Sequence, residues 1–263
     1  MALTAVYNGG LSRIILSATA LGASATYAVF DRTLNGTTYT IVRGGIRVTV
    51  GSQLASLNDF EFPAGVAVTY RVRSYNVSNV LQQTFTAVIT QGLGETWLKS
   101  VGRPFLNRRV TASDASDVSY TARAGIFPVI GRTNPVAVTD SFSVKSFQLS
   151  LATVTKAEAD GLRILITSGD ILFLHTPADF PAPGGYFVCG DVTEGRQNMP
   201  WERRWFTLPL TKVVAPPADV TATLGTWQTV VNTYATWTAE IAANATWSNL
   251  LTLVADPSEV DVP

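Results

Sequence analysis

Apolar and polar residues alternate over short segments throughout the first part of the chain. Val, Ile, Tyr, Phe and Thr recur at every second position, a pattern typical of half-buried β-strands. Turn sequences separate the segments, at Leu34–Thr37 (LNGT), Arg43–Gly45 (RGG) and Phe62–Gly65 (FPAG). About six or seven short strands in so few residues predict a β-sandwich over residues 1–95. The strand-like segments lie at 12–19, 25–33, 37–45, 46–50, 68–75 and 82–90.

The alternation stops at Gly92–Lys99, which contains two glycines and is predicted to be a linker. A second unit follows over residues 100–214. Its long alternating segment at 141–154 predicts a strand, and three further strands are predicted at 170–177, 184–194 and 202–214. A single helix between strands predicts a β-rich barrel or sandwich for this unit.

The predicted helix spans about 155–168 and carries its own start and stop signals. Thr155 is suited to the N-cap, and Glu158 three residues later completes a capping box. Gly169 is placed to end the helix, because glycine adopts the left-handed conformation that commonly follows a helix. The apolar face consists of Ala159, Leu162, Leu165 and Ile166.

Beyond a stiff linker at Ala215–Asp219 (APPAD), the dipeptide Thr-Trp occurs three times with a spacing of ten residues, ending at Trp227, Trp237 and Trp247. On one continuous helix, ten residues turn the chain by about 1000°, so the three Trp would spiral around the axis. Three short helices explain the repeat better, each with Thr as N-cap and Trp at its first position. A strand remains an alternative, because an even spacing places all three Trp on one face.

The Thr-Trp repeat therefore makes residues 220–263 a short helical segment that we interpret as a docking tail. Each Trp buries a large apolar area when it packs in a helical cluster or against another subunit. Stacking on sugar rings is the alternative. It is less favoured because no cluster of Asp, Asn and Gln surrounds the Trp residues to bind sugar hydroxyls.

Charge and composition limit the classes of partner that the protein is expected to bind. Only 14% of residues are charged and the formal net charge is zero, so a basic groove for nucleic acid is not expected. Few surface charges also suggest that much surface is buried against other copies, in a homo-oligomer. No apolar segment is long enough to span a membrane and no secretory signal is visible. The 263 residues suffice for two domains with separate cores.

Candidate chemistry is sparse. The only histidine, His175, lies in the strand-like sequence ILFLHTP and is more typical of a strand residue than of a general base. One cysteine, Cys189, excludes an intrachain disulfide. With so few ligands of this kind, metal sites built from several His and Cys are excluded, and no cofactor is expected.

Neither a glycine-rich phosphate loop nor a nucleophile elbow occurs in the sequence. Carboxylate pairs could in principle serve a glycosidase, but pairs of this kind are common on any surface. Two arginine doublets are interpreted as edge charges or ion pairs between subunits. We therefore predict that the protein is not an enzyme. The carboxylate pairs are Asp59 with Glu61 and Asp114 with Asp117, and the doublets are Arg108-Arg109 and Arg203-Arg204.

Residues 60–76, FEFPAGVAVTYRVRSYN, resemble the corner of a fibronectin type III domain. The resemblance implies that Tyr70 takes the place of the corner tyrosine, with its hydroxyl bonding back to the turn. Residues 27–45 are similar to the middle hairpin of that family, although its early-strand Trp is missing. The resemblance covers roughly residues 3–92 and implies a fibronectin type III-like sandwich.

Three further stretches resemble minor tail proteins of long-tailed actinobacterial bacteriophages and prophages. They are WLKSVGRPFLNRRVT, the run from GIFPVIGRTNPVAVTD to SGDILFLHTP, and the closing YATWTAEIAANATWSNLLTLVADPSEVDVP. The resemblance implies a structural component of the tail tip or baseplate, assembled in the host cytoplasm as part of the virion. Residues 100–214 would then form a barrel like that of tail-tube and distal tail proteins, with one helix.

In this interpretation the barrel domain makes the main ring contact with other copies, threefold or sixfold, and with other phage tail proteins. Residues 1–92 would be self-contained and face outward. That domain comes first in the chain, unlike in the usual distal tail protein. The alternative function is a carbohydrate-binding tail module that contacts host cell-wall glycan.

Overall fold

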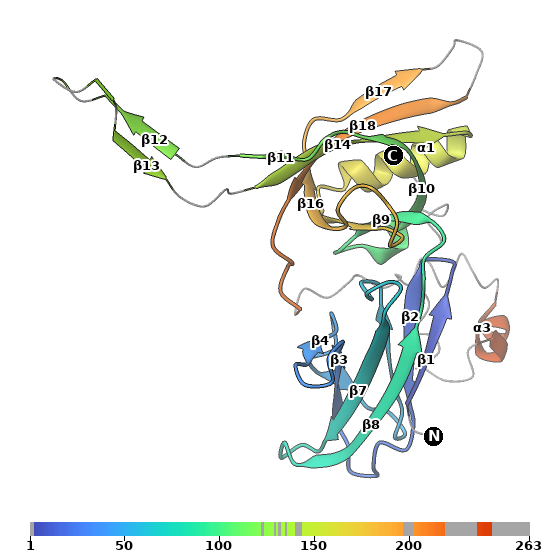
Figure 1. Cartoon of the computed structure of the whole chain (residues 1–263). Helices are drawn as coiled ribbons and strands as arrows, with labels where there is room; N and C mark the ends of the chain where they lie inside the picture. Colours follow the sequence, from blue (N-terminus) through green and yellow to red (C-terminus); the bar gives the residue numbers. More distant parts are fainter. Residues whose placement is uncertain are drawn as a thin grey trace.

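The protein folds into two β-rich modules that pack directly on each other, as the computed structural model shows (Figure 1). The prediction of a mainly β protein with a barrel and one flanking helix is confirmed. The structure describes residues 3–121, 124–128, 130, 133–134, 136–139, 144–196, 202–218 and 236–243.

The N-terminal module consists of two antiparallel sheets. The three-stranded sheet contains β1 (Leu3–Asn8), β2 (Arg13–Ala18) and β6 (Ala55–Asp59), in the order β1-β2-β6. The larger sheet has the order β4-β3-β7-β8, and β5 also pairs with β3. Its strands are β3 (Tyr27–Thr33), β4 (Thr40–Ile41), β5 (Val48–Thr49), β7 (Ala67–Tyr75) and β8 (Leu81–Thr90).

One core joins the two sheets of this module. Alternate residues of β2, such as Ile14 and Leu16, pack with alternate residues of β3 and β7, such as Phe30 and Val72. The period-two pattern read from the sequence is therefore the pattern of burial. Two strands, β1 and β6, had not been predicted from the sequence, because ASLND in β6 lacks the β-branched and aromatic residues that mark the others.

Six antiparallel strands close the second module into a barrel, in the order β14-β10-β9-β15-β16-β18 and back to β14. The strands are β9 (Thr96–Ser100), β10 (Arg108–Ala115), β14 (Lys145–Thr153), β15 (Leu172–His175), β16 (Gly185–Cys189) and β18 (Arg204–Lys212). The short strands β11 (Ser119–Tyr120) and β17 (Thr193–Arg196) pair with β14 and β18, and a 3₁₀ turn, Pro104–Leu106, follows β9.

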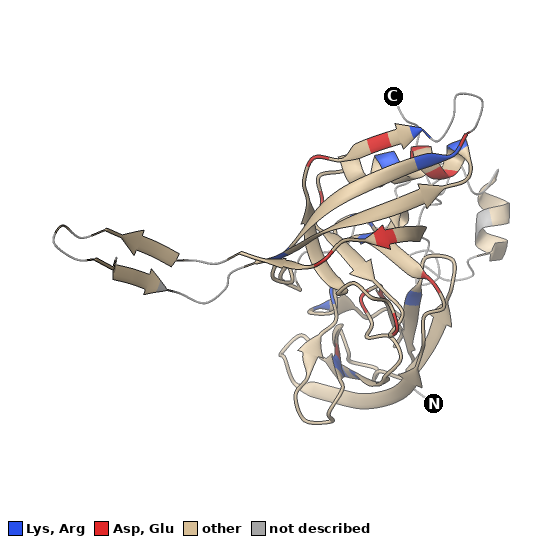
Figure 2. Cartoon of the chain, turned by 45° about the horizontal axis from the view of Figure 1, so that its top comes forward, with Lys and Arg blue, Asp and Glu red and all other residues tan. Residues whose placement is uncertain are grey.

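Helix α1 (Lys156–Thr167) packs onto the barrel core through Ala159, Leu162 and Leu165. The predicted capping box is confirmed: Thr155 Oγ1 accepts the Glu158 backbone N–H at 3.2 Å, and the Glu158 carboxylate accepts from the Thr155 N–H. Gly169 follows the helix with φ of 73°, in the left-handed region as expected. Ion pairs from Arg163 to Glu194 join α1 to β17, where charged residues gather in Figure 2.

The predicted linker at Gly92–Lys99 is wrong over its second half. Residues Thr96–Ser100 form β9, a strand of the barrel whose five residues are all buried. The sequence of β9 shows no alternation because both of its faces are covered. Leu98 points into the barrel core, whereas Lys99 contacts the N-terminal module.

A two-stranded hairpin extends away from the barrel, made by β12 (Ala124–Phe127) and β13 (Val136–Thr139) (Figure 1). The sequence analysis had not predicted it as a separate element. Within the described part of the chain, no helix has the length and apolar character needed to cross a bilayer.

One rung of the Thr-Trp repeat lies among the described residues. Helix α3 (Trp237–Ala243) begins directly after Thr236, whose Oγ1 accepts the Ala239 backbone N–H at 3.2 Å. The prediction of a short helix with Thr as N-cap and Trp at its first position is confirmed for this rung. Trp227 and Trp247 lie outside the described residues.

Candidate functional site at the junction of the modules

The outer faces of three neighbouring barrel strands meet the N-terminal module. The strand register places Phe173 of β15 opposite Lys99 of β9 and Tyr186 of β16, and it places His175 opposite Trp97. Because side chains alternate along a strand, these residues point away from the barrel core, into which Leu98, Leu174 and other apolar neighbours point. We call this contact the junction.

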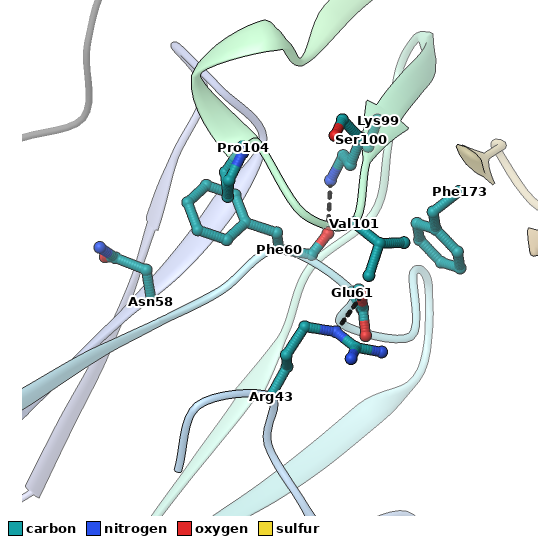
Figure 3. A pocket seen from close by; sticks show the side chains of 9 residues that line it. All are labelled: Arg43, Asn58, Phe60, Glu61, Lys99, Ser100, Val101, Pro104 and Phe173. Carbon is teal, nitrogen blue, oxygen red and sulfur yellow. Dashed lines mark hydrogen bonds and ion pairs between the residues drawn. The ribbon is translucent and has the colours of Figure 1, made fainter. Parts of the chain in front are cut away.

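Lys99 occupies the centre of the junction with only 1% of its surface exposed. Its Nζ donates to the carbonyl of Ser12 at 2.5 Å and to the carbonyl of Phe60 at 2.7 Å, the second contact being drawn in Figure 3. It also lies 2.9 Å from His175 Nδ1 and 3.2 Å from Ser12 Oγ. We call these four residues the Lys99 cluster. It joins β9 and β15 of the barrel to two turns of the N-terminal module.

His175 is 4% exposed and ends β15, as the strand interpretation predicted. Its ring lies edge-on to Phe62, with ring centroids 4.7 Å apart. Burial and then the Lys99 cation lower the pKa of His175 to about 2, against an opposing interaction with the Phe62 backbone. The imidazole is therefore neutral. With Lys99 as an ammonium donor, Nδ1 accepts and the ring proton is on Nε2, which makes no hydrogen bond of good geometry in the described part of the chain.

Two effects oppose each other at Lys99. Burial lowers its pKa to about 7, while the carboxylates of Asp59 and Glu61 act to raise it. The ammonium form has three N–H donors, which match the carbonyls of Ser12 and Phe60 and, when its Nδ1 is unprotonated, His175. Lys99 therefore acts as a cation that satisfies polar atoms of both modules.

Ser12 has an unusual backbone for this role. It is fully buried and has φ of 49°, in the left-handed region that non-glycine residues adopt at a cost of about 1–2 kcal/mol. In this conformation both its carbonyl and its hydroxyl oxygen face Lys99. The strain is thus located at a contact between the modules.

Asp59, at the end of β6, is one of two carboxylates beside the Lys99 cluster. It pairs with Arg32 and accepts the Tyr70 hydroxyl at 2.7 Å. Its other oxygen accepts the Glu61 backbone N–H at 2.9 Å. Tyr70 therefore bonds to this side chain just before the Phe62–Gly65 turn, and the prediction that its hydroxyl bonds to the turn itself is wrong. Burial, followed by the Asp59 charge, raises the pKa of Tyr70.

Glu61 repeats this arrangement across the junction. Its carboxylate accepts from Arg43 Nε at 2.7 Å and from the hydroxyl of Tyr186 on β16 at 2.7 Å. Burial raises the pKa of Tyr186, and the Glu61 carboxylate raises it further. The pair Asp59 and Glu61 thus forms two Arg–carboxylate–Tyr groups, one inside the N-terminal module and one between modules.

Arg43 also binds the chain that follows β18. Its guanidinium donates to the carbonyls of Pro217 at 2.6 Å and Pro216 at 3.1 Å. The Gly44 N–H donates to the carbonyl of Ala218 at 3.0 Å. The predicted stiff linker therefore returns from the barrel to the N-terminal module.

A cavity of about 20 Å³ lies within the junction, lined by residues that include Arg43, Glu61, Lys99 and Phe173 (Figure 3). Such a volume holds about one water molecule and is far too small for a saccharide. Since the carboxylates beside it are already bound by Arg and Tyr, the junction is arranged to hold the modules together. Residues 1–92 have a core of their own, as expected, and the junction adds polar contacts between that module and the barrel.

The other candidate residues lie apart from the junction. Asp114 and Asp117 are exposed on and just after β10. Arg109 pairs with Glu95, Arg204 pairs with Glu194, and Arg108 packs against Gly161 of α1. Among the described residues, no group of three or more His, Cys, Asp or Glu could hold a metal ion.

Lys99, Ser12 and Phe60 were not predicted from the sequence as site residues. One signal was present: positions of β9, β15 and β16 that should face solvent carry Trp97, Phe173 and Tyr186. Aromatic residues at both inward and outward positions indicate a strand covered on two sides. Comparison with known proteins adds no assignment, since no protein-family model and no curated protein matches this chain.

Proposed function

We propose that this protein is a structural component of a bacteriophage tail tip or baseplate, a minor or distal tail protein that assembles with copies of itself around the tail axis. The single observation that carries this proposal is the β12–β13 hairpin. A two-stranded hairpin is only marginally stable in water unless it packs on something else.

The hairpin exposes apolar side chains along both strands. Ile126 is 67% exposed and Val138 is 62% exposed, and Phe127 and Val136 are exposed as well. Neither strand carries a charged residue, so both strands are drawn in tan in Figure 2. An uncharged strand pair that projects from its own module suits burial against another subunit.

Two features of the fold support the position in a tail. The closed barrel with one packed helix is the design implied by the resemblance to tail-tube and distal tail proteins. The two antiparallel sheets of the N-terminal module, with the orders β1-β2-β6 and β4-β3-β7-β8, support a fibronectin type III-like assignment. In this proposal the protein is part of the virion and has no catalytic role.

Replacing residues 122–143 with a short Gly-Asn turn between Thr121 and Val144 tests the proposal. The barrel core contains none of the hairpin residues, so the variant should fold. We expect loss of self-association by light scattering and loss of incorporation into tails. Ile126→Asp should act in the same way, whereas Val77→Asp, at a residue 78% exposed on the N-terminal module, serves as the matched control. Normal assembly of the shortened chain would reject the proposal.

The second candidate, a module that binds cell-wall glycan, is favoured by one observation. Trp237 on α3 is 61% exposed, and Ile241 one turn later is 64% exposed. An exposed aromatic ring can stack on a sugar, although it can also bury against a protein. Binding of the purified protein to host cell walls, abolished by Trp237→Ala while assembly persists, would favour this candidate.

A further inference from the structure

The Lys99 cluster places two basic side chains in direct contact inside the protein. Lys99 Nζ and His175 Nδ1 are 2.9 Å apart, and both residues are almost fully buried. No ion pair with a carboxylate is formed by either residue within the described structure. Such a pair accommodates one proton, carried by Lys99, but a second proton would place two like charges in contact without water.

We propose that the junction is an acid-sensitive latch, which holds the barrel on the N-terminal module while His175 is neutral and releases it when His175 is protonated. The opening separates Lys99 and His175 from the turns at Ser12 and Phe60. The chain at Gln91–Glu95 still connects the modules. This inference does not depend on the proposed role in a phage tail.

The charged groups around Lys99 and His175 favour release of the junction when His175 is protonated. Arg32 of β3 adds another positive charge to the environment of His175. Asp59 and Glu61 are the nearby carboxylates, but Asp59 is held by Arg32 and Tyr70, and Glu61 by Arg43 and Tyr186. An imidazolium at position 175 therefore has no free carboxylate among these groups to compensate it.

The strain at Ser12 points to the same device. Its left-handed backbone aims two oxygen atoms at Lys99, and this contact offsets the cost of the conformation. Once Lys99 withdraws, the carbonyl and hydroxyl of Ser12 lose this donor, so the opening should change the environment of the turn between β1 and β2.

The single histidine of the chain provides a direct test. With ¹⁵N-labelled histidine, nuclear magnetic resonance reports the charge and tautomer of His175 alone, and small-angle X-ray scattering on the same samples reports separation of the modules. We expect a neutral imidazole with its proton on Nε2 while the modules are closed. Titration and expansion should then coincide, below the usual histidine pKa of about 6.5. Titration of His175 in a closed molecule would overturn the proposal.

Two variants separate the latch from general acid effects. His175→Gln retains an acceptor for Lys99 but does not titrate, so expansion should be lost at the pH at which the wild type expands. Glu61→Gln removes the other titratable contact between modules, and acid expansion should persist in it. Expansion of His175→Gln at the wild-type pH would contradict the latch. If His175→Gln does not fold, the wild-type measurement tests the proposal by itself, through the agreement between the pH of His175 titration and the pH of expansion.

Discussion

Lys99 Nζ on β9 lies 2.9 Å from His175 Nδ1 on β15, so one buried base hydrogen-bonds another on the neighbouring strand of the barrel. The same ammonium binds the carbonyls of Ser12 and Phe60 in the other module. A lysine in such a position can bridge the two modules only because every N–H finds an acceptor. Stability and the relation between the modules therefore depend on this side chain.

Lys99→Met should destabilise the protein by about 1–3 kcal/mol, because buried carbonyls lose their donor while the apolar stem is replaced at similar volume. Urea unfolding followed by circular dichroism measures the change. Lys145→Met, at an exposed position of β14, is the control and should have little effect. An unchanged free energy of unfolding for Lys99→Met would show that the contacts of Lys99 make no net contribution to stability.

Stability should fall on acidification. The pKa of His175 is about 2 in the folded state and has its ordinary value of 6.5 in the unfolded chain, so between these values the unfolded chain binds more protons. The free energy of unfolding therefore decreases as pH falls below about 6.5. Lys99, with a folded pKa of about 7 against 10.5, acts in the same direction above pH 7. Denaturant midpoints measured across pH should show a shallower acid slope in His175→Gln.

Tyr70→Phe and Tyr186→Phe form a matched pair, since each removes one hydroxyl that donates to a carboxylate at 2.7 Å. Tyr70→Phe should lower global stability by about 1.5–3 kcal/mol, the range for a hydrogen bond to a charged group. Tyr186→Phe should mainly increase hydrogen exchange at residues 59–62, because its partner lies in the other module. If the two variants had equal effects on global stability and on hydrogen exchange, the assignment of one group to the N-terminal module and the other to the junction would be contradicted.

Gly45→Ala should be strongly destabilising, because a Cβ at this position would lie 2.7 Å from the Phe30 carbonyl and 2.8 Å from the Val42 carbonyl. Both are backbone atoms of the N-terminal module, one within β3 and one directly after β4, and neither can move like the end of a flexible side chain. Gly94→Ala is the control, as its Cβ would meet no atom within 4 Å. Thermal unfolding compares the two variants. Similar melting temperatures would show that the backbone around Gly45 can shift at little cost in stability.

Trp237→Ala should leave the stability of the isolated chain within about 0.5 kcal/mol, because the side chain is largely exposed. If α3 docks on a neighbouring tail protein, the contact should lose on the order of 3 kcal/mol, more than a hundredfold in affinity. Tail assembly and host adsorption by the variant distinguish the two candidate functions. Intact virions with poor adsorption would reject the docking interpretation and favour glycan binding.

The sequence by itself determined the features that depend on neighbouring residues. The capping box at Thr155 and Glu158, the left-handed Gly169 and the Thr236-Trp237 helix start are local, since each needs only a few bonds within one turn. Period-two burial along β2, β7 and β14 was equally readable, because one face of each strand packs on a core.

Only the tertiary structure decided what lies between the modules. The stretch predicted as a linker became β9 because Lys99 and Trp97 are covered by residues from distant parts of the chain. Tyr70 hydrogen-bonds to Asp59, 11 residues away, and Tyr186 hydrogen-bonds to Glu61, 125 residues away. Partners at such separations leave no periodic signal in a single sequence, because burial on a strand's second face depends on which other surface packs against it.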